Sequence, residues 1–136
     1  ARQHDPNALH LLQTVPGIGK TLSLVILYEI HHIERFPTVG DFASYARLVK
    51  CAKESAGKRL GSSGRKIGNV HLKWAFSEAA TLFLRCNPDG LKFKRRLEKK
   101  HGKAKTMAII AHKLGRAVYY MLERGKAFDM QKFLTA

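Results

Sequence analysis

Residues 14–20 read Thr14-Val15-Pro16-Gly17-Ile18-Gly19-Lys20 and lie between two segments with helical periodicity, 7–13 and 21–32. Helix, Pro-Gly-apolar-Gly-Lys, helix is the pattern of a helix-hairpin-helix, here over residues 11–32. Its glycines leave backbone N–H groups accessible where the second helix begins, and the helix dipole favours an anion at that point. We therefore predict that Gly17, Gly19 and Lys20 bind a phosphate group. The alternative is a purely structural tight turn.

The rest of the chain also has helical rather than strand periodicity. No stretch alternates apolar and polar residues, so the predicted class is all-α, with the hairpin followed by a basic loop and a small helical bundle. Thr38 and Asn69 are expected to cap helices, and Gly125 is expected to end one. Further helices are predicted over residues 39–48, 69–85, 89–101 and 104–123, within a long-helix region at 69–125 and before a terminal segment at 126–136 that packs back on the core.

Apolar residues at helical spacing give the predicted core faces. Trp74 is more often a core or rim residue in such a position than a contact to a base or phosphate. The expected core residues are Leu22, Val25, Ile26 and Ile30 in the second helix, Phe42, Tyr45, Ala46 and Val49 in the third, Leu72, Ala75, Phe76, Ala79 and Phe83 in the fourth, and Met107, Ile110, Ala111, Leu114, Val118 and Met121 in the longest.

Residues 50–68 interrupt this periodicity and are rich in glycine, serine and cations. The whole chain of 136 residues has a formal net charge of +15, and residues 50–105 hold sixteen of its 25 cations against four acids. Such a localised imbalance predicts a polyanionic partner, DNA or RNA. The alternative is a solvated linker. The residues predicted to bind nucleic acid here and just beyond are Lys53, Lys58, Arg59, Arg65, Lys66, Asn69 and Lys73.

Several function classes lack their residues in this sequence. Cys51 and Cys86 have no C-x-x-C partner, so we predict neither a zinc site nor a disulfide, and reduced thiols point to a cytoplasmic protein. No apolar run reaches the roughly 18 residues that span a bilayer, so no membrane partner is expected. The ten acids are dispersed, which argues against a two-metal nuclease centre and predicts no metal site in this domain. Because the chain lacks an initiator Met, it is expected to be part of a longer protein.

A set of ordered motifs resembles the C-terminal domain of the DEDD insertion-sequence transposases, the bridge-RNA-guided recombinases. The resemblance covers about residues 11–84 and is looser beyond them. The motifs that carry it are Val15-Pro16-Gly17-Ile18-Gly19, Phe36, Tyr45-Ala46, Glu54-Ser55-Ala56-Gly57-Lys58, Gly68-Asn69-Val70-His71-Leu72-Lys73 and Glu78-Ala79-Ala80.

The resemblance implies a single C-terminal transposase domain over residues 1–136, which supplies a serine nucleophile for DNA strand cleavage and exchange. Ser55 lies thirteen residues before Gly68, the spacing of that serine in the family, and Ser62 and Ser63 are its rivals. An N-terminal nuclease-like domain of the same protein would supply four acids and Mg²⁺. The isolated fragment would then be inactive.

The resemblance also implies partners and a setting: DNA, a guide (bridge) RNA, a homo-oligomer when full-length, and the nucleoid of a bacterial cytoplasm. The sequence departs from the family where Arg47-Leu48-Val49-Lys50 replaces Gly-Leu-x-Pro and where Ala56 replaces a glycine. The competing hypothesis is a non-catalytic helix-hairpin-helix module that binds DNA or RNA.

Overall fold

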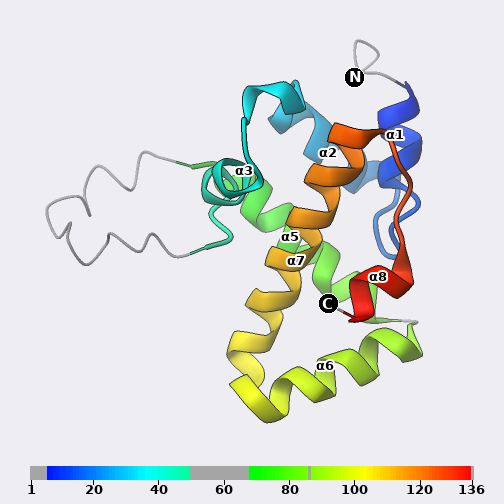
Figure 1. Ribbon diagram of the computed structural model, residues 1–136, viewed down its shortest axis with the longest axis vertical. Coiled ribbons are helices and arrows are strands. Elements are labelled where there is room, and N and C mark those ends of the chain that lie inside the picture. The colour runs from blue at the N-terminus through cyan, green and yellow to red at the C-terminus, as the bar shows by residue number, and fades with distance from the viewer. Residues whose placement is uncertain (1–5, 50–67, 86, 136) are drawn as a thin grey trace, which may run out of the picture.

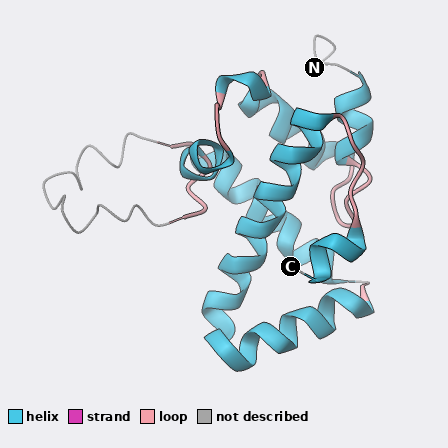
Figure 2. Ribbon diagram, viewed as in Figure 1, coloured by secondary structure: helices cyan, strands magenta, loops and turns pink. Residues whose placement is uncertain are grey.

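The structure is a computed structural model that describes residues 6–49, 68–85 and 87–135, and within those ranges every regular element is a helix (Figures 1 and 2). The all-α prediction is therefore confirmed. The elements are α1 (Pro6–Leu12), α2 (Lys20–Ile30), the 3₁₀ turn η1 (Ile33–Arg35), α3 (Val39–Tyr45), α5 (Val70–Arg85), α6 (Pro88–His101), α7 (Lys103–Arg124) and α8 (Met130–Thr135).

Helix α5 runs through the centre of the fold and packs against both α2 and α7. Its buried side chains recur every three or four residues, as the sequence predicted. Phe76 meets Phe42 of α3 edge-on, with ring centroids 6.0 Å apart. The buried residues of α5 are Leu72, Ala75, Phe76, Ala79, Ala80, Phe83 and Leu84.

Helix α7 is the longest and joins most of the other elements, packing against α5, α6 and α3. Its buried Tyr119 hydroxyl donates to the Phe36 carbonyl at 2.8 Å, and burial raises the pKa of that hydroxyl. Gly115 admits the side chain of Leu48, which would overlap a Cβ at that position. The predicted end of the helix is confirmed, because Gly125 is left-handed (φ 68°) and its N–H bonds to the Met121 carbonyl.

Three helices begin with the side-chain caps that their sequences favour. Thr38 Oγ1 accepts from Asp41 N at 3.1 Å, and Asn69 Oδ1 accepts from Leu72 N at 2.9 Å, so both predicted caps are confirmed. Asn87 caps α6 in the same way, by accepting from Gly90 N at 3.1 Å. The terminal segment packs back as predicted, with Phe133 buried.

One core prediction was wrong. Val49 is 37% exposed, because α3 ends at Tyr45 and the helical face that would have buried Val49 does not continue. Trp74, which was expected in the core or at its rim, is 52% exposed and lies on the solvent side of α5 beside buried Ala75 and Phe76. The exposed side chains of Val70 and Trp74, one helical turn apart, lie on that same side.

Candidate functional site

The chain on either side of the basic segment comes together at one place, which we call the neck (residues 45–49 and 68–69). Asn69 N donates to the Tyr45 carbonyl at 2.6 Å. Gly68 has φ +104°, and a Cβ on it would lie 2.5 Å from Arg47 Cγ and 3.1 Å from the Tyr45 carbonyl oxygen. Only glycine allows this close approach without strain. The segment that holds Ser55 and half of the chain's predicted binding residues therefore starts and finishes at the same point of the core.

The first half of the neck is a Schellman turn that ends α3. Arg47 N donates to the Ser44 carbonyl at 3.0 Å and Leu48 N to the Ala43 carbonyl at 2.9 Å. Arg47 occupies the left-handed position, with φ 58°, where glycine is the usual residue. This turn explains why α3 is shorter than the predicted 39–48, and it directs Leu48 onto Gly115 of α7.

The side chain of Asn69 connects the neck to α2. Its Nδ2 donates to Glu29 Oε1 at 2.8 Å and to the Tyr45 hydroxyl oxygen at 3.3 Å, while its Oδ1 caps α5. Both amide hydrogens and the carbonyl of this half-buried side chain are therefore used inside the protein. Asn69, which was predicted to bind nucleic acid, thus also links α2, α3 and α5.

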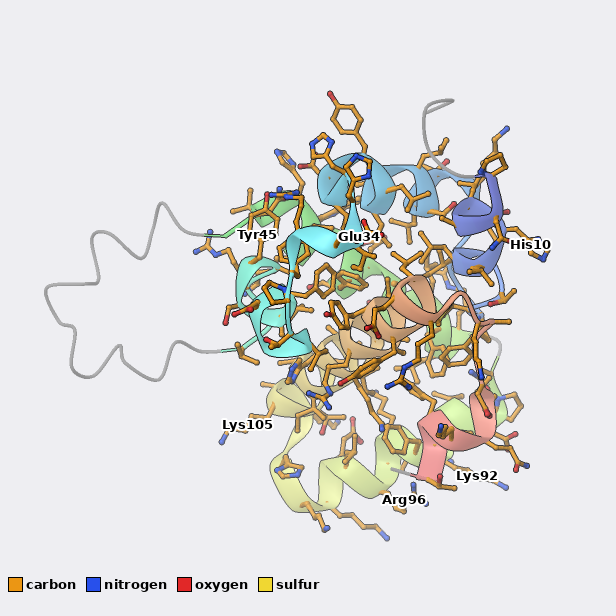
Figure 3. All side chains as sticks on the ribbon, turned by 45° about the horizontal axis from the view of Figure 1, so that its top comes forward. His10, Glu34, Tyr45, Lys92, Arg96 and Lys105 are labelled. Atoms are coloured by element: carbon orange, nitrogen blue, oxygen red, sulfur yellow. The ribbon has the colours of Figure 1, made fainter. Side chains whose placement is uncertain are left out.

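Arg35 completes this polar cluster from η1. Its guanidinium donates to the Ile30 carbonyl at 2.6 Å and lies 5.1 Å from the ring centroids of both Phe36 and Tyr45. The hydrogen bond from Asn69 and the nearby Arg35 guanidinium lower the pKa of the Tyr45 hydroxyl. Tyr45 lies at this edge of the molecule (Figure 3) and is half-buried. The neck thus holds a phenol that ionises more easily than usual, in the middle of four elements.

The predicted phosphate site lies at the turn between α1 and α2. Ile18 N bonds to the Val15 carbonyl at 3.0 Å and Gly17 has φ +96°, the features of a type II turn with Pro16 and Gly17 in its centre. A Cβ on Gly17 would lie 2.6 Å from Phe83 N, so this glycine lets the turn pack on the backbone of α5. Packing against α5 therefore requires glycine at position 17, and the sequence pattern did not reveal this requirement.

Gly19 and Lys20 are placed differently from Gly17. Gly19 is exposed, has nothing within 4 Å of a Cβ position, and is the N-cap of α2 without a side-chain cap. Lys20 is the exposed first residue of that helix. The first backbone amides of α2 thus have no side-chain acceptor. The corresponding amides of α3, α5 and α6 bond to Thr38, Asn69 and Asn87.

The structure separates the described site residues into two groups. The hairpin turn meets α5 at Leu82 and Phe83, whereas Asn69 and the exposed Lys73 lie at the other end of that helix. Thirteen residues of helix correspond to a separation of about 20 Å. Figure 1 shows the turn and the neck on opposite sides of the molecule. The remaining predicted residues, Ser55, Lys53, Lys58, Arg59, Arg65 and Lys66, lie outside the described residues.

Sequence reasoning missed Glu29 and Arg35, and it treated Tyr45 only as a core residue. Nothing local marks the Asn69–Glu29 bond, because its partners are 40 residues apart. The Phe36 and Tyr45-Ala46 motifs were the available signal. Both are in the cluster, where the rings of Phe36 and Tyr45 pack 5.2 Å apart.

Neither a metal site nor a membrane span is evident in the described part of the chain. No group of three or more His, Cys, Asp or Glu residues within it could hold a metal ion. Within the same ranges, none of the helices has the length and apolarity needed to cross a bilayer.

Comparison with known proteins places the chain among mobile-element proteins. The family model described as "Transposase IS116/IS110/IS902 family" matches residues 9–95, which include the hairpin turn and the neck. The "Insertion element IS110 uncharacterized 43.6 kDa protein" of Streptomyces coelicolor is 27% identical over 121 residues, which are 88% of this chain and 30% of that protein. The chain thus spans about 30% of the length of this relative. No solved structure gives a significant match.

Proposed function

The chain belongs to the IS116/IS110/IS902 transposase family, and we propose that it is the C-terminal part of a transposase that cuts and exchanges DNA strands through a serine nucleophile. The proposed nucleophile is Ser55. The observation that supports this most strongly is the neck, because it fixes both ends of the segment that contains Ser55 to one point of the core.

The composition of that segment suits attack on a phosphodiester. It holds Lys50, Lys53, Lys58, Arg59, Arg65 and Lys66 against a single acid, Glu54. Cations near the reacting phosphorus stabilise the negative charge that grows on its oxygens in the transition state. Gly57, close to Ser55, removes a side chain that would keep the backbone away from DNA.

The proposed step joins Ser55 to DNA. The Oγ atom attacks phosphorus and an Oγ–P bond forms while the bond from phosphorus to a deoxyribose oxygen breaks. The serine proton leaves Oγ, and the departing oxygen accepts a proton. A serine hydroxyl needs a base for this reaction, and the step requires one from outside this segment. Attack by a hydroxyl of another strand on the same phosphorus then releases Ser55 and completes the exchange.

The Mg²⁺ implied by the family resemblance does not fit the residues of this chain. Its acids are dispersed in sequence, and the described ones form no cluster that could hold a metal ion. The proposal therefore assigns the metal ligands to an N-terminal nuclease-like domain of the same protein, and the role of Ser55 does not depend on them. The proposal also includes a guide RNA and assembly into a homo-oligomer, both of which the family resemblance implies.

The hairpin turn is proposed as a contact to the nucleic-acid backbone. The uncapped amides at Gly19 and Lys20 support this role, since backbone N–H groups bind phosphate without regard to base sequence. Gly19→Val should then weaken binding about equally for unrelated DNA sequences, with unchanged helix content by circular dichroism. If the Gly19→Val protein folds and binds nucleic acid normally, the hairpin turn has only a structural role.

The decisive experiment uses the full-length protein with its guide RNA. Ser55→Ala should abolish strand exchange and leave nucleic-acid binding intact, and Ser62→Ala and Ser63→Ala are the matched controls from the same basic segment. Mass spectrometry of a trapped protein–DNA adduct identifies the linked residue. An adduct at Ser62 or Ser63 would replace Ser55 as the nucleophile. Full activity of all three variants, without an adduct, would favour the non-catalytic binding module.

A further inference from the structure

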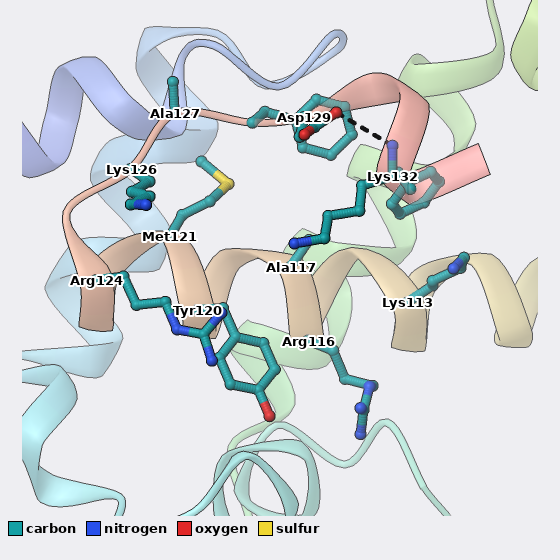
Figure 4. A pocket seen from close by; sticks show the side chains of 12 residues that line it. Lys113, Arg116, Ala117, Tyr120, Met121, Arg124, Lys126, Ala127, Asp129 and Lys132 are labelled. Atoms are coloured by element: carbon teal, nitrogen blue, oxygen red, sulfur yellow. Dashed lines mark hydrogen bonds between the residues drawn. The ribbon is translucent and has the colours of Figure 1, made fainter. Parts of the chain in front are cut away.

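A groove separates the C-terminal half of α7 from the segment that leads into α8 (Figure 4). Its volume is about 530 Å³. The apolar part of its lining consists of Met121, Phe128 and Phe133, with the ring of Tyr120 beside them. The groove is lined by residues that none of the sequence motifs included.

The groove gathers positive charge. All five cations of residues 106–136 line it: Lys113, Arg116, Arg124, Lys126 and Lys132. The same stretch has two acids, and both are already engaged. Glu123 pairs with Arg124 at 3.7 Å, and the Asp129 carboxylate accepts from Lys132 N at 3.1 Å at the start of α8.

Lys113 is the least exposed of these five cations. It is half-buried, and its Nζ lies 5.0 Å from the ring centroid of Phe133 and 5.7 Å from that of Phe93, with no carboxylate of the described residues in ion-pair contact. Burial, together with the charge of Arg116, lowers its pKa. A partly desolvated cation of this kind is stabilised by any anion that enters the groove.

We propose that this groove binds the backbone of single-stranded DNA, as a nucleic-acid contact in addition to the basic segment and the hairpin turn. Sequence-independent binding of single strands combines a cationic groove with apolar and aromatic surface for the bases, and both are present here. The inference rests on the proposed function in one respect: strand exchange exposes single-stranded DNA. The cations and the apolar lining of the groove do not depend on the role of Ser55.

The α8 wall of the groove and the neck lie on different sides of α7 (Figure 1). Helix α3, which ends in the neck, packs on α7 through Leu48 and Gly115, while α8 lies across the helix from it (Figures 1 and 3). One strand bound in the groove would therefore leave the neck accessible to another.

The test neutralises three groove cations whose side chains make no hydrogen bond or ion pair with other described residues: Arg116→Gln, Lys126→Gln and Lys132→Gln together. The matched control is Lys99→Gln, Lys103→Gln and Lys105→Gln, three exposed cations near the turn between α6 and α7. Both variants lose the same charge. The probe is fluorescein-labelled oligo(dT) of about 15 nucleotides, a length near the upper end of the site sizes known for single-strand-binding domains. Its binding is measured by fluorescence anisotropy.

The groove variant should bind oligo(dT) more than about tenfold more weakly. Its slope of log affinity against log salt should fall by about 2, because each neutralised phosphate of a single strand accounts for about 0.7 of that slope. The control variant should retain most of its affinity. Photocrosslinking of a 5-bromodeoxyuridine oligonucleotide should label Tyr120 or Phe128.

Three results would overturn the proposal: equal losses in both variants, no crosslink in the groove, or tighter binding of poly-glutamate than of oligo(dT), which would mark an acidic-peptide site. A further variant, with Lys53, Lys58, Arg59, Arg65 and Lys66 all changed to Gln, separates this proposal from the proposed function. It should lose strand exchange in the full-length protein but keep the groove crosslink. Loss of the crosslink in that variant would show that the groove has no site of its own.

Discussion

The hairpin turn and the neck are both glycine-dependent turns that pack at the ends of α5, but different forces hold them. In the hairpin turn, Gly17 lies against the α5 backbone, and Thr14 Oγ1 donates to the Leu11 carbonyl at 2.6 Å and accepts from Phe128 N at 3.0 Å. In the neck, Asn69 joins three helices through polar bonds, two of them to residues more than twenty positions away. The hairpin turn could be recognised because its Pro-Gly-apolar-Gly pattern is local in the sequence. The contacts that the fold adds to that turn, and the whole polar cluster of the neck, could not.

The sharpest contrast is expected from Gly17→Ala against Gly19→Ala. At Gly17 the added Cβ meets the Phe83 backbone and the residue must keep φ +96°, so we expect a loss of about 3 kcal/mol in unfolding free energy. At Gly19 the space is open, and the loss should stay below about 1 kcal/mol. Urea unfolding of both variants measures the difference, and similar losses would mean that the turn does not rest on α5.

Asn69→Asp tests the neck without removing the α5 cap. The carboxylate can still accept from Leu72 N, but it faces Glu29 where an amide donor used to be, so we expect a loss of about 2 kcal/mol at neutral pH. In the Glu29→Gln background the same change should cost much less, because the glutamine amide can donate to the new carboxylate. A double-mutant cycle by urea unfolding measures this coupling. Additive losses would show that the Asn69–Glu29 bond contributes little.

Arg47 offers a smaller change in the opposite direction. Because its left-handed φ of 58° is unfavourable for a residue with a Cβ, Arg47→Gly should raise the unfolding free energy by up to about 1 kcal/mol. Arg47→Ala keeps the Cβ and serves as the control, so the gap between the two melting temperatures isolates the backbone term. If the glycine variant is no more stable than the alanine variant, the Schellman turn is not strained at Arg47.

The smallest effect concerns the ionisation of the two tyrosines. The pKa of Tyr45 is lowered from 10.0 by the Asn69 hydrogen bond and the Arg35 guanidinium, whereas burial raises the pKa of Tyr119. A lowered folded-state pKa means that Tyr45 ionisation stabilises the folded protein as pH rises through that pKa, and that this contribution is lost as pH falls below it.

Ultraviolet difference titration should show that Tyr45 ionises before Tyr119, with Tyr45→Phe removing the early phase. Arg35→Gln should shift that phase to higher pH. An early phase that survives in the Tyr45→Phe protein would assign it to another tyrosine.

The sequence predicted the local features of the fold better than the contacts between distant elements. Helical spacing predicted the α5 core, and the local chemistry of Thr38, Asn69 and Gly125 predicted two caps and one helix end. Val49 failed because a turn with arginine in the left-handed position ended α3 early. For the site, sequence could pick out Asn69 as important but not its partners, since Glu29 and Tyr45 reach it only through the packing of α2 and α3.

The position of α7 has a consequence for how the protein is made. Residues 9–95 match the family model, yet the core they form is closed by side chains from residues 103–124, among them Ile110, Leu114 and Val118. On a ribosome that adds 5–20 residues per second, the 39 residues between the ends of α5 and α7 take roughly two to eight seconds. Until then the faces of α3 and α5 that pack against α7 have no cover. During that time the nascent chain exposes apolar surface of the kind that chaperones recognise.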